Sequence, residues 1–292
     1  MKRIVLLLTA VFIIFVFSSC SPVTNGTTVA ATTLPVYEFT SFLCQGTNIS
    51  VDRLITEEVS CLHDYTLQVQ QMRTIEQAEL VVISGAGLED FLDDALHTAN
   101  NILDASSGIT LQCSNSEHEH VHEGHTHDED PHIWLSPENA KQMAHNIHDG
   151  LSNKYPQYSQ IFSENLALLD TKIDTLIQYA DTELANISSR ELITFHDGFS
   201  YMAEAFDLTI LHAIEEESGS EASAAELIEL INLVSNHDVR AIFTEKNSSG
   251  AGASVIAAET NTKIYALDMA LSGDSYFTAM YHNIDTLKEA LK

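Results

Sequence analysis

The chain has 292 residues, enough for two α/β lobes, and 45% of them are hydrophobic, as in a globular protein. It carries 13 basic against 42 acidic residues, which argues against nucleic-acid binding because contacts to phosphate need lysine and arginine. The formal net charge of −29 suits a protein that attracts cations, although solvation of the surface would explain it equally well.

Residues 1–19 are predicted to form a secretory signal peptide. Lys2 and Arg3 precede an apolar run that is shorter than the roughly 17–25 residues of a membrane-spanning helix. The Phe-Ser-Ser-Cys segment at 17–20 resembles a bacterial lipobox, which implies that Cys20 is lipidated and becomes the mature N-terminus. We expect residues 20–33 to form a tether, and removal of residues 1–19 leaves a net charge of 11 − 42 = −31.

Three further cysteines follow Cys20, at Cys44, Cys61 and Cys113. Export permits a disulfide, and three cysteines allow one internal bridge at most. Cys44 with Cys61 is the preferred pair, and buried free thiols are the alternative. Because the chain contains no Cys-x-x-Cys pattern, a cysteine zinc site is not expected.

Short β-branched runs alternate with helical patterns in both halves of the chain. We predict strands at residues 28–33, 49–55, 80–84, 102–104, 192–195, 209–213, 241–244 and 264–267. We predict helices at residues 36–43, 67–78, 88–99, 137–152, 199–206, 222–236, 251–259 and 276–291. This alternation implies parallel sheets flanked by helices, so the fold class is α/β with one lobe at 34–155 and another at 188–292.

Residues 156–187 are predicted to connect the lobes as one long helix. Apolar residues recur there every three or four positions from Tyr158 to Ala180, and the only proline is at the start. Such a helix would be about 45 Å long and would act as a stiff connector. Two ordinary helices separated by a break are the alternative.

Metal-capable side chains follow several of the predicted strands. His63 follows the second strand, His196 ends the fifth, Asp268 follows the last, and His132 lies just before a helix whose N-cap is Ser136. Parallel sheets bind ligands at the carboxyl ends of their strands, so two ligands from each lobe would form a four-ligand site in the cleft between the lobes. The alternative for each residue is a hydrogen-bonded structural role.

A histidine-rich loop at 114–131 precedes His132. Its histidines stand among glutamates and aspartates, at His118, His120, His122, His125 and His127. A polar run without core-forming residues predicts a mobile loop with weak, exchangeable metal sites. We expect the loop to collect or sense metal near the cleft mouth, while His132 is a fixed ligand. A tolerated surface insertion is the alternative.

Four segments carry a resemblance to a known family. They are "LVVISGAGLEDFLDD" (80–94), "DPHIWLSP" (130–137), "FHDGFSYMAEAFDL" (195–208) and "LDMALSGDSYFTAMYHNIDTLKEAL" (267–291). From about residue 28 to residue 292 the chain resembles the zinc- and manganese-binding solute-binding lipoproteins of bacterial ABC importers. The resemblance implies a monomeric, non-enzymatic receptor that is lipid-anchored outside the cytoplasmic membrane and delivers metal to an ABC permease. It also implies the ligand set His63, His132, His196 and Asp268.

The third ligand position separates two types of member in this family, with histidine in the zinc type and glutamate in the manganese type. His196 therefore implies Zn²⁺, which suits three imidazoles and one carboxylate, whereas Mn²⁺ prefers more oxygen. Manganese or another divalent metal is the alternative. The chain departs from the family pattern at "CLHDYTL" (61–67), which lacks the usual prolines, and at Glu245-Lys246, where Glu-Pro is common. Glu245 is not expected to be a ligand. Asp64 or Asp197 would offset the metal's charge and orient imidazoles.

The rival function is a cell-surface zinc hydrolase, in which Asp64 or Glu216 would act as the base. The sequence matches His-Glu-x-x-His once, at residues 118–122, but this run lacks the helical context that the motif needs, so it does not support a hydrolase. An adhesin is compatible with the receptor, because exposure on the surface permits both. Metal binding through imidazoles should weaken below about pH 6, as protons compete with the metal.

Overall fold

The computed structural model describes residues 27–59, 62, 65–97, 99, 101–112, 129–215, 223–237, 239–246 and 250–292. The signal peptide, Cys20, His63 and the histidines of the loop lie outside these residues, and so do Asp64 and Glu216. None of the helices within the described ranges has the length and apolar character that a membrane span requires.

The N-terminal lobe is built on a parallel sheet with strand order β2-β1-β3-β4. Its strands are β1 (Thr27–Ala31), β2 (Ile49–Arg53), β3 (Leu80–Ile83) and β4 (Ile102–Asp104). Its helices are α2 (Leu34–Leu43), α3 (Val69–Gln77) and α4 (Asp93–Leu96), the last preceded by the 3₁₀ turn η1 (Asp90–Leu92). Strand β1 is fully buried from Val29 to Ala31, as expected for an inner strand covered on both faces.

The C-terminal lobe repeats this arrangement, with strand order β6-β5-β7-β8 in a second parallel sheet. Its strands are β5 (Glu191–His196), β6 (Thr209–Glu215), β7 (Ala241–Glu245) and β8 (Lys263–Leu267). Its helices are α7 (Ser200–Ala205), α8 (Ala224–His237) and α9 (Ala251–Thr260). In each sheet the direction in which strands are added reverses once, between β1 and β3 in the first sheet and between β5 and β7 in the second. Open α/β sheets bind ligands at such a switch point.

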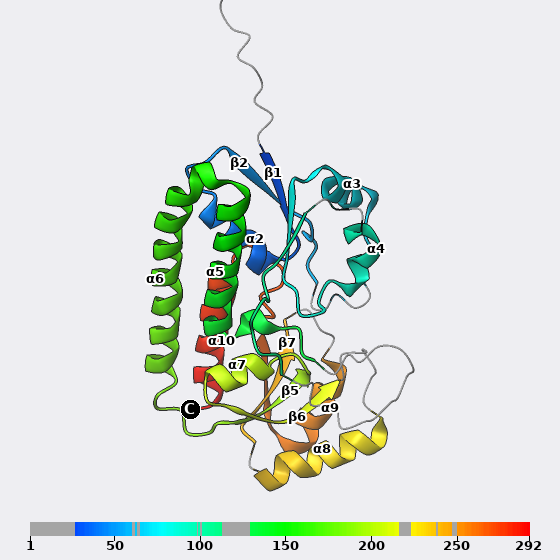
Figure 1. The fold of residues 1–292 in the computed structure, drawn as a ribbon. Coiled ribbons are helices and arrows are strands. Elements are labelled where there is room, and N and C mark those ends of the chain that lie inside the picture. The colour runs from blue at the N-terminus through cyan, green and yellow to red at the C-terminus, as the bar shows by residue number, and fades with distance from the viewer. Residues whose placement is uncertain are drawn as a thin grey trace, which may run out of the picture.

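Three helices run along one side of the molecule and join the lobes (Figure 1). They are α5 (Pro137–Lys154), α6 (Ser159–Glu183) and α10 (Tyr276–Ala290), with the 3₁₀ turns η2 (Ile133–Leu135) before α5 and η3 (Pro156–Tyr158) before α6. Helix α6 extends from the level of β2 to the level of the C-terminus, and its 25 residues correspond to about 38 Å. The predicted long helix is thus confirmed, with its first turn as 3₁₀ and its end at Glu183, and α6 does not show the break of the alternative with two helices.

The largest hydrophobic core crosses both lobes. It contains Val29 of the first sheet, Trp134 of η2, Phe162 of α6 and Phe243 of the second sheet. A smaller core, which includes Phe195 and Ile242, packs the other face of the second sheet against α8 and α9. Because the lobes share a continuous core, a wide rotation between them would expose apolar surface, and we expect the connection to be stiff.

The predicted α/β class and all eight strands are confirmed, with differences of at most two residues at either end. Three expectations need correction. The predicted helix 88–99 is only η1 and the single turn α4, because the side chain of Glu89 folds back onto the backbone N–H groups of Ser84 and Gly85. The range 20–33, expected as a tether, overlaps β1 from Thr27 onward. Cys44 is a buried free thiol, so the preferred bridge to Cys61 is not formed.

Candidate metal centre

His132 lies in the turn that leads into η2, at the junction of the two lobes, and is 1% exposed. Its imidazole Nδ1 lies 2.7 Å from Oδ1 of Asp130, and its backbone N–H donates to the same oxygen at 2.9 Å. The Asp-Pro-His sequence favours this turn, because an aspartate side chain readily bonds the backbone two residues further on. A histidine that donates Nδ1–H to a carboxylate carries its metal-binding lone pair on Nε2.

Asp130 is itself fixed by the C-terminal lobe. Its carbonyl accepts a hydrogen bond of 3.0 Å from the hydroxyl of Tyr201 in α7, and its N–H donates to the carbonyl of Gln112. The Tyr201 hydroxyl also accepts from the Gln112 N–H at 2.9 Å. Burial raises the pKa of Tyr201 to about 12, so this hydroxyl stays protonated. His132 is therefore held through Asp130 by residues of both lobes.

His196 is the last residue of β5, and Glu245 is the last residue of the adjacent strand β7. Both lie at the switch point of the second sheet, and both are 7% exposed. The distance from His196 Nδ1 to Glu245 Oε1 is 3.6 Å, an ion-pair distance that is longer than a hydrogen bond. Glu245 thus stands beside His196 as Asp130 stands beside His132, with looser contact.

The two histidines meet across the junction of the lobes. Their ring centroids are 5.3 Å apart and their planes are nearly perpendicular, at 88°. Gly198 lies against both rings: a Cβ at this position would be 2.8 Å from His196 Cδ2 and 2.9 Å from His132 Cε1. The Phe-His-Asp-Gly-Phe segment therefore needs glycine here, because any side chain would push the rings apart.

Asp268 follows β8 directly, as predicted, and its side chain is 15% exposed. Its Oδ2 accepts a hydrogen bond of 3.1 Å from Lys246 Nζ, and its Oδ1 accepts from the Ala270 N–H at 2.9 Å. Asn283 of α10 bonds both the N–H and the carbonyl of Asp268. The hydrogen bond to Asp268 raises the pKa of Lys246, so the ammonium is charged at neutral pH.

The loop after Asp268 is docked on the N-terminal lobe. Met269 accepts a hydrogen bond of 2.8 Å from the indole of Trp134, and Ser272 Oγ bonds both the N–H and the carbonyl of Val59. Arg53 donates to the carbonyl of Gly273 at 2.7 Å. Val59 precedes the segment that contains His63, so the chain enters that segment next to the Asp268 loop.

The structure brings His132 and His196 together but not the whole predicted ligand set. Across the ranges that the structure describes, no three His, Cys, Asp or Glu side chains lie close enough together to hold a metal ion. His63 is outside those ranges, although Leu62 before it is buried and the Tyr65 N–H donates to the Leu62 carbonyl. The four-ligand site and the role of the histidine-rich loop therefore stay predictions.

Sequence reasoning missed the two carboxylates that stand beside the imidazoles. Asp197, which was expected to orient an imidazole, is buried at 4%, and its role stays a prediction. Asp130 and Glu245 lie at ion-pair distance from the rings of His132 and His196. The Asp-Pro turn two residues before His132 was the available signal for Asp130. Glu245 had no such signal, because it lies beside His196 only through the pairing of β5 with β7.

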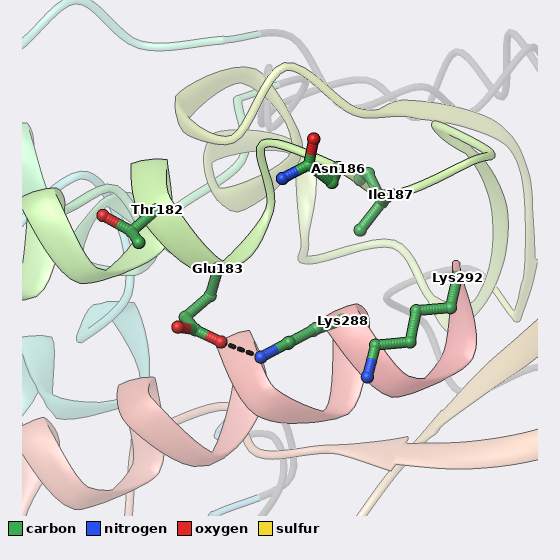
Figure 2. Close-up of a pocket in the computed structure, with 6 residues that line it drawn as sticks. All are labelled: Thr182, Glu183, Asn186, Ile187, Lys288 and Lys292. Carbon is green, nitrogen blue, oxygen red and sulfur yellow. Dashed lines mark hydrogen bonds and ion pairs between the residues drawn. The ribbon is translucent and has the colours of Figure 1, made fainter.

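A separate cavity of about 170 Å³ lies where α6 and α10 end (Figure 2). Its lining residues are Thr182, Glu183, Asn186, Ile187, Lys288 and Lys292. Figure 2 shows the Lys288 ammonium directed at the Glu183 carboxylate, with which it forms an ion pair. These residues include no imidazole or thiol, and their one side-chain carboxylate is paired. This cavity is therefore not the predicted metal site.

The buried histidine pair suits a borderline divalent cation such as Zn²⁺. The chain is also similar in sequence and fold to known proteins. A zinc-binding lipoprotein of Streptococcus pneumoniae strain R6, AdcA, is 28% identical over 307 residues, which cover 99% of this chain and 61% of AdcA. The chain thus spans about three fifths of that relative.

Two solved structures have the same fold. The Zn(II)-bound ZnuA-like domain of Streptococcus pneumoniae AdcA has a TM-score of 0.74 and 26% identity, covering 91% of this chain and 99% of that domain. The laminin-binding protein of Streptococcus agalactiae has a TM-score of 0.78 and 23% identity, covering 91% of this chain and 100% of that one, and shows the fold alone. The family model described as zinc-uptake complex component A, periplasmic (ZnuA), matches residues 29–290, and the chain therefore belongs to this family.

Proposed function

We propose that this chain is an extracytoplasmic receptor that binds Zn²⁺ and delivers it to the permease of an ABC importer, without catalysis. The observation that carries the proposal is the contact between His132 and His196, two buried imidazoles from different lobes with a carboxylate beside each ring. Such carboxylates fix the tautomer and orientation of metal-binding histidines. Family membership and the zinc in the printed names of its relatives support the choice of ion.

The full ligand set in this proposal is His63, His132, His196 and Asp268. Three imidazoles and one carboxylate give Zn²⁺ the four-coordinate environment that it adopts in proteins. His196 at the third position favours zinc over manganese, which prefers oxygen ligands. Anchoring through a lipid on Cys20 would keep the monomeric receptor at the membrane that holds the permease.

Release of the metal is expected to need only small movements of the lobes. The core is continuous across the lobes, and α5, α6 and α10 lie together along one side of the molecule and join them. This architecture is more compatible with displacement of a metal-binding side chain when the receptor docks on the permease than with wide opening of a hinge. Comparison of metal-free and zinc-loaded crystal structures tests this point, since a large rigid-body rotation would contradict it.

The proposed function is tested by zinc titration of the metal-free mature chain against a competing chelator of known affinity. The expected result is one tight zinc per chain and much weaker binding of Mn²⁺. A variant that lacks Glu117–Asp128 of the histidine-rich loop should keep the tight zinc site and lose only weaker zinc sites. If the deletion removed tight binding, the loop itself would be the main site and the assignment to His132 and His196 would be wrong.

A further inference from the structure

Lys246 is placed beside Asp268 by the pairing of β7 and β8. Glu245, the last residue of β7, is in register with Leu267, the last residue of β8, so the residues that follow emerge side by side. The Lys246 N–H donates to the Leu267 carbonyl at 2.9 Å, and Lys246 Nζ donates to Asp268 Oδ2 at 3.1 Å. The ammonium therefore binds the carboxylate expected to be the fourth zinc ligand.

The carboxylate is rigid, whereas the ammonium is not. Asp268 is fixed through Oδ1 by Ala270 and through its backbone by Asn283, and Oδ2 is the oxygen that Lys246 binds. The side chain of Lys246 is 56% exposed. A lysine ammonium on a flexible four-carbon stem can move into water at little cost, and exposed ion pairs are weak.

We propose that Lys246 is an internal competitor of zinc for Asp268. The ammonium holds the carboxylate while no metal is bound, leaves it when Zn²⁺ arrives, and binds it again as the metal departs. This deepens the proposed function and rests on Asp268 as a zinc ligand. This competition lowers the affinity of the four-ligand site for zinc and speeds the release of zinc. Without it, release from such a site would be slow.

The test is the variant Lys246→Met, which removes the charge and keeps much of the apolar stem. Its matched control is Lys263→Met, which removes an exposed lysine at the opposite end of β8, roughly 16 Å from Asp268. Zinc affinity is measured by chelator competition, and zinc release by rapid mixing with excess chelator. We expect Lys246→Met to bind zinc about two- to fivefold more tightly and to release it correspondingly more slowly, and Lys263→Met to match the wild type.

Two further measurements separate this inference from the proposed function. In an Asp268→Asn background, Lys246→Met should no longer change zinc affinity, while Asp268→Asn alone should weaken it. In protein with ¹³C-labelled lysine, the Cε signal of Lys246, assigned from its absence in Lys246→Met, should shift on addition of zinc, and that of Lys263 should not.

Equal affinity and release in Lys246→Met and wild type, with Asp268→Asn weakened, would overturn the role of Lys246 and leave the receptor function standing. Unchanged zinc binding in Asp268→Asn would remove Asp268 from the ligand set and would overturn the competitor role with it.

Discussion

The imidazole rings of His132 and His196 lie with their centroids 5.3 Å apart and their planes at 88°, although 64 residues of chain separate them. One ring comes from the turn before α5 and the other from the end of β5, and each has a buried carboxylate beside its Nδ1. Two oriented imidazoles at the junction of two lobes are the basis of the zinc-receptor function proposed for this chain.

Replacement of either histidine by alanine should weaken zinc binding at least about 100-fold, because each change removes one of the four proposed bonds to the metal. The measurement is competition with a chromophoric chelator. His145→Ala is the matched control, since His145 also pairs with a carboxylate, Asp170 at 3.0 Å, but on the exposed side of α5 and α6. An unchanged affinity in both His132→Ala and His196→Ala would remove these residues from the site.

Asp130→Asn should weaken zinc binding about 10–100-fold, as is typical for partners that orient metal-binding histidines. Both contacts of His132 are to Oδ1 of Asp130, so an asparagine that keeps its carbonyl oxygen there loses the negative charge that strengthens the bond to Nδ1–H, and a flipped amide would donate to Nδ1 and favour the wrong tautomer. Asp170→Asn, which alters the surface pair with His145, serves as the control and should bind zinc as the wild type does. Equal affinities in the two variants would show that Asp130 does not orient His132.

Glu89 should make stability depend on pH. Its carboxylate is buried at the end of β1 and β3, where it accepts from Thr32 Oγ1 at 2.6 Å and from the Ser84 and Gly85 N–H groups. Burial raises its pKa from 4.5 to about 7, and the hydrogen bonds only partly oppose that shift. Because the folded pKa is the higher one, the stabilisation is complete below about pH 4.5 and is lost as the pH rises through about 7.

The loss in the free energy of unfolding that is attributable to Glu89 is on the order of 3 kcal/mol. Urea unfolding of metal-free protein between pH 5 and pH 8 measures it, in wild type and in Glu89→Gln. The free energy of unfolding should fall less steeply with pH in Glu89→Gln, because glutamine does not titrate. Parallel curves for the two proteins would contradict a raised pKa for Glu89.

Trp134→Phe should destabilise the fold by about 1–3 kcal/mol, because it leaves the buried carbonyl of Met269 without its hydrogen bond from the indole. Since Met269 follows Asp268, the same variant should also weaken zinc binding. Tyr276→Phe is an informative comparison: it removes a buried hydrogen bond to the Trp134 carbonyl and leaves the contact with Met269 in place. A Trp134→Phe protein as stable as the wild type would show that the loop after Asp268 does not depend on this bond.

The fold was largely predictable because it depends on local patterns. β-branched runs mark the inner parallel strands, and the apolar spacing of α6 marks a helix packed along one face. The Glu89 loop was not predictable, because the helical pattern of 88–99 is overridden by a side chain that bonds the backbone behind it. The meeting of His132 with His196 could be expected from strand ends and from family resemblance.

The partner of His196 could not be read from the sequence, whereas the Asp-Pro turn was a local signal for Asp130 beside His132. Glu245 approaches His196 only because β7 lies next to β5, and nothing in the 48 residues between them indicates that pairing. The contact of Lys246 with Asp268 likewise depends on the register of β7 with β8. Charged side chains at the ends of neighbouring strands can pair with one another or bind a common ligand, and the sequence pattern is the same in both cases.

The most direct test of the account is anomalous diffraction at the zinc edge from crystals of the zinc-loaded mature chain. The account predicts one strong peak at the junction of the lobes, roughly 2.0–2.1 Å from a ring nitrogen of both His132 and His196. A zinc ion bound only by histidines of the 114–131 loop, with no metal between His132 and His196, would contradict it.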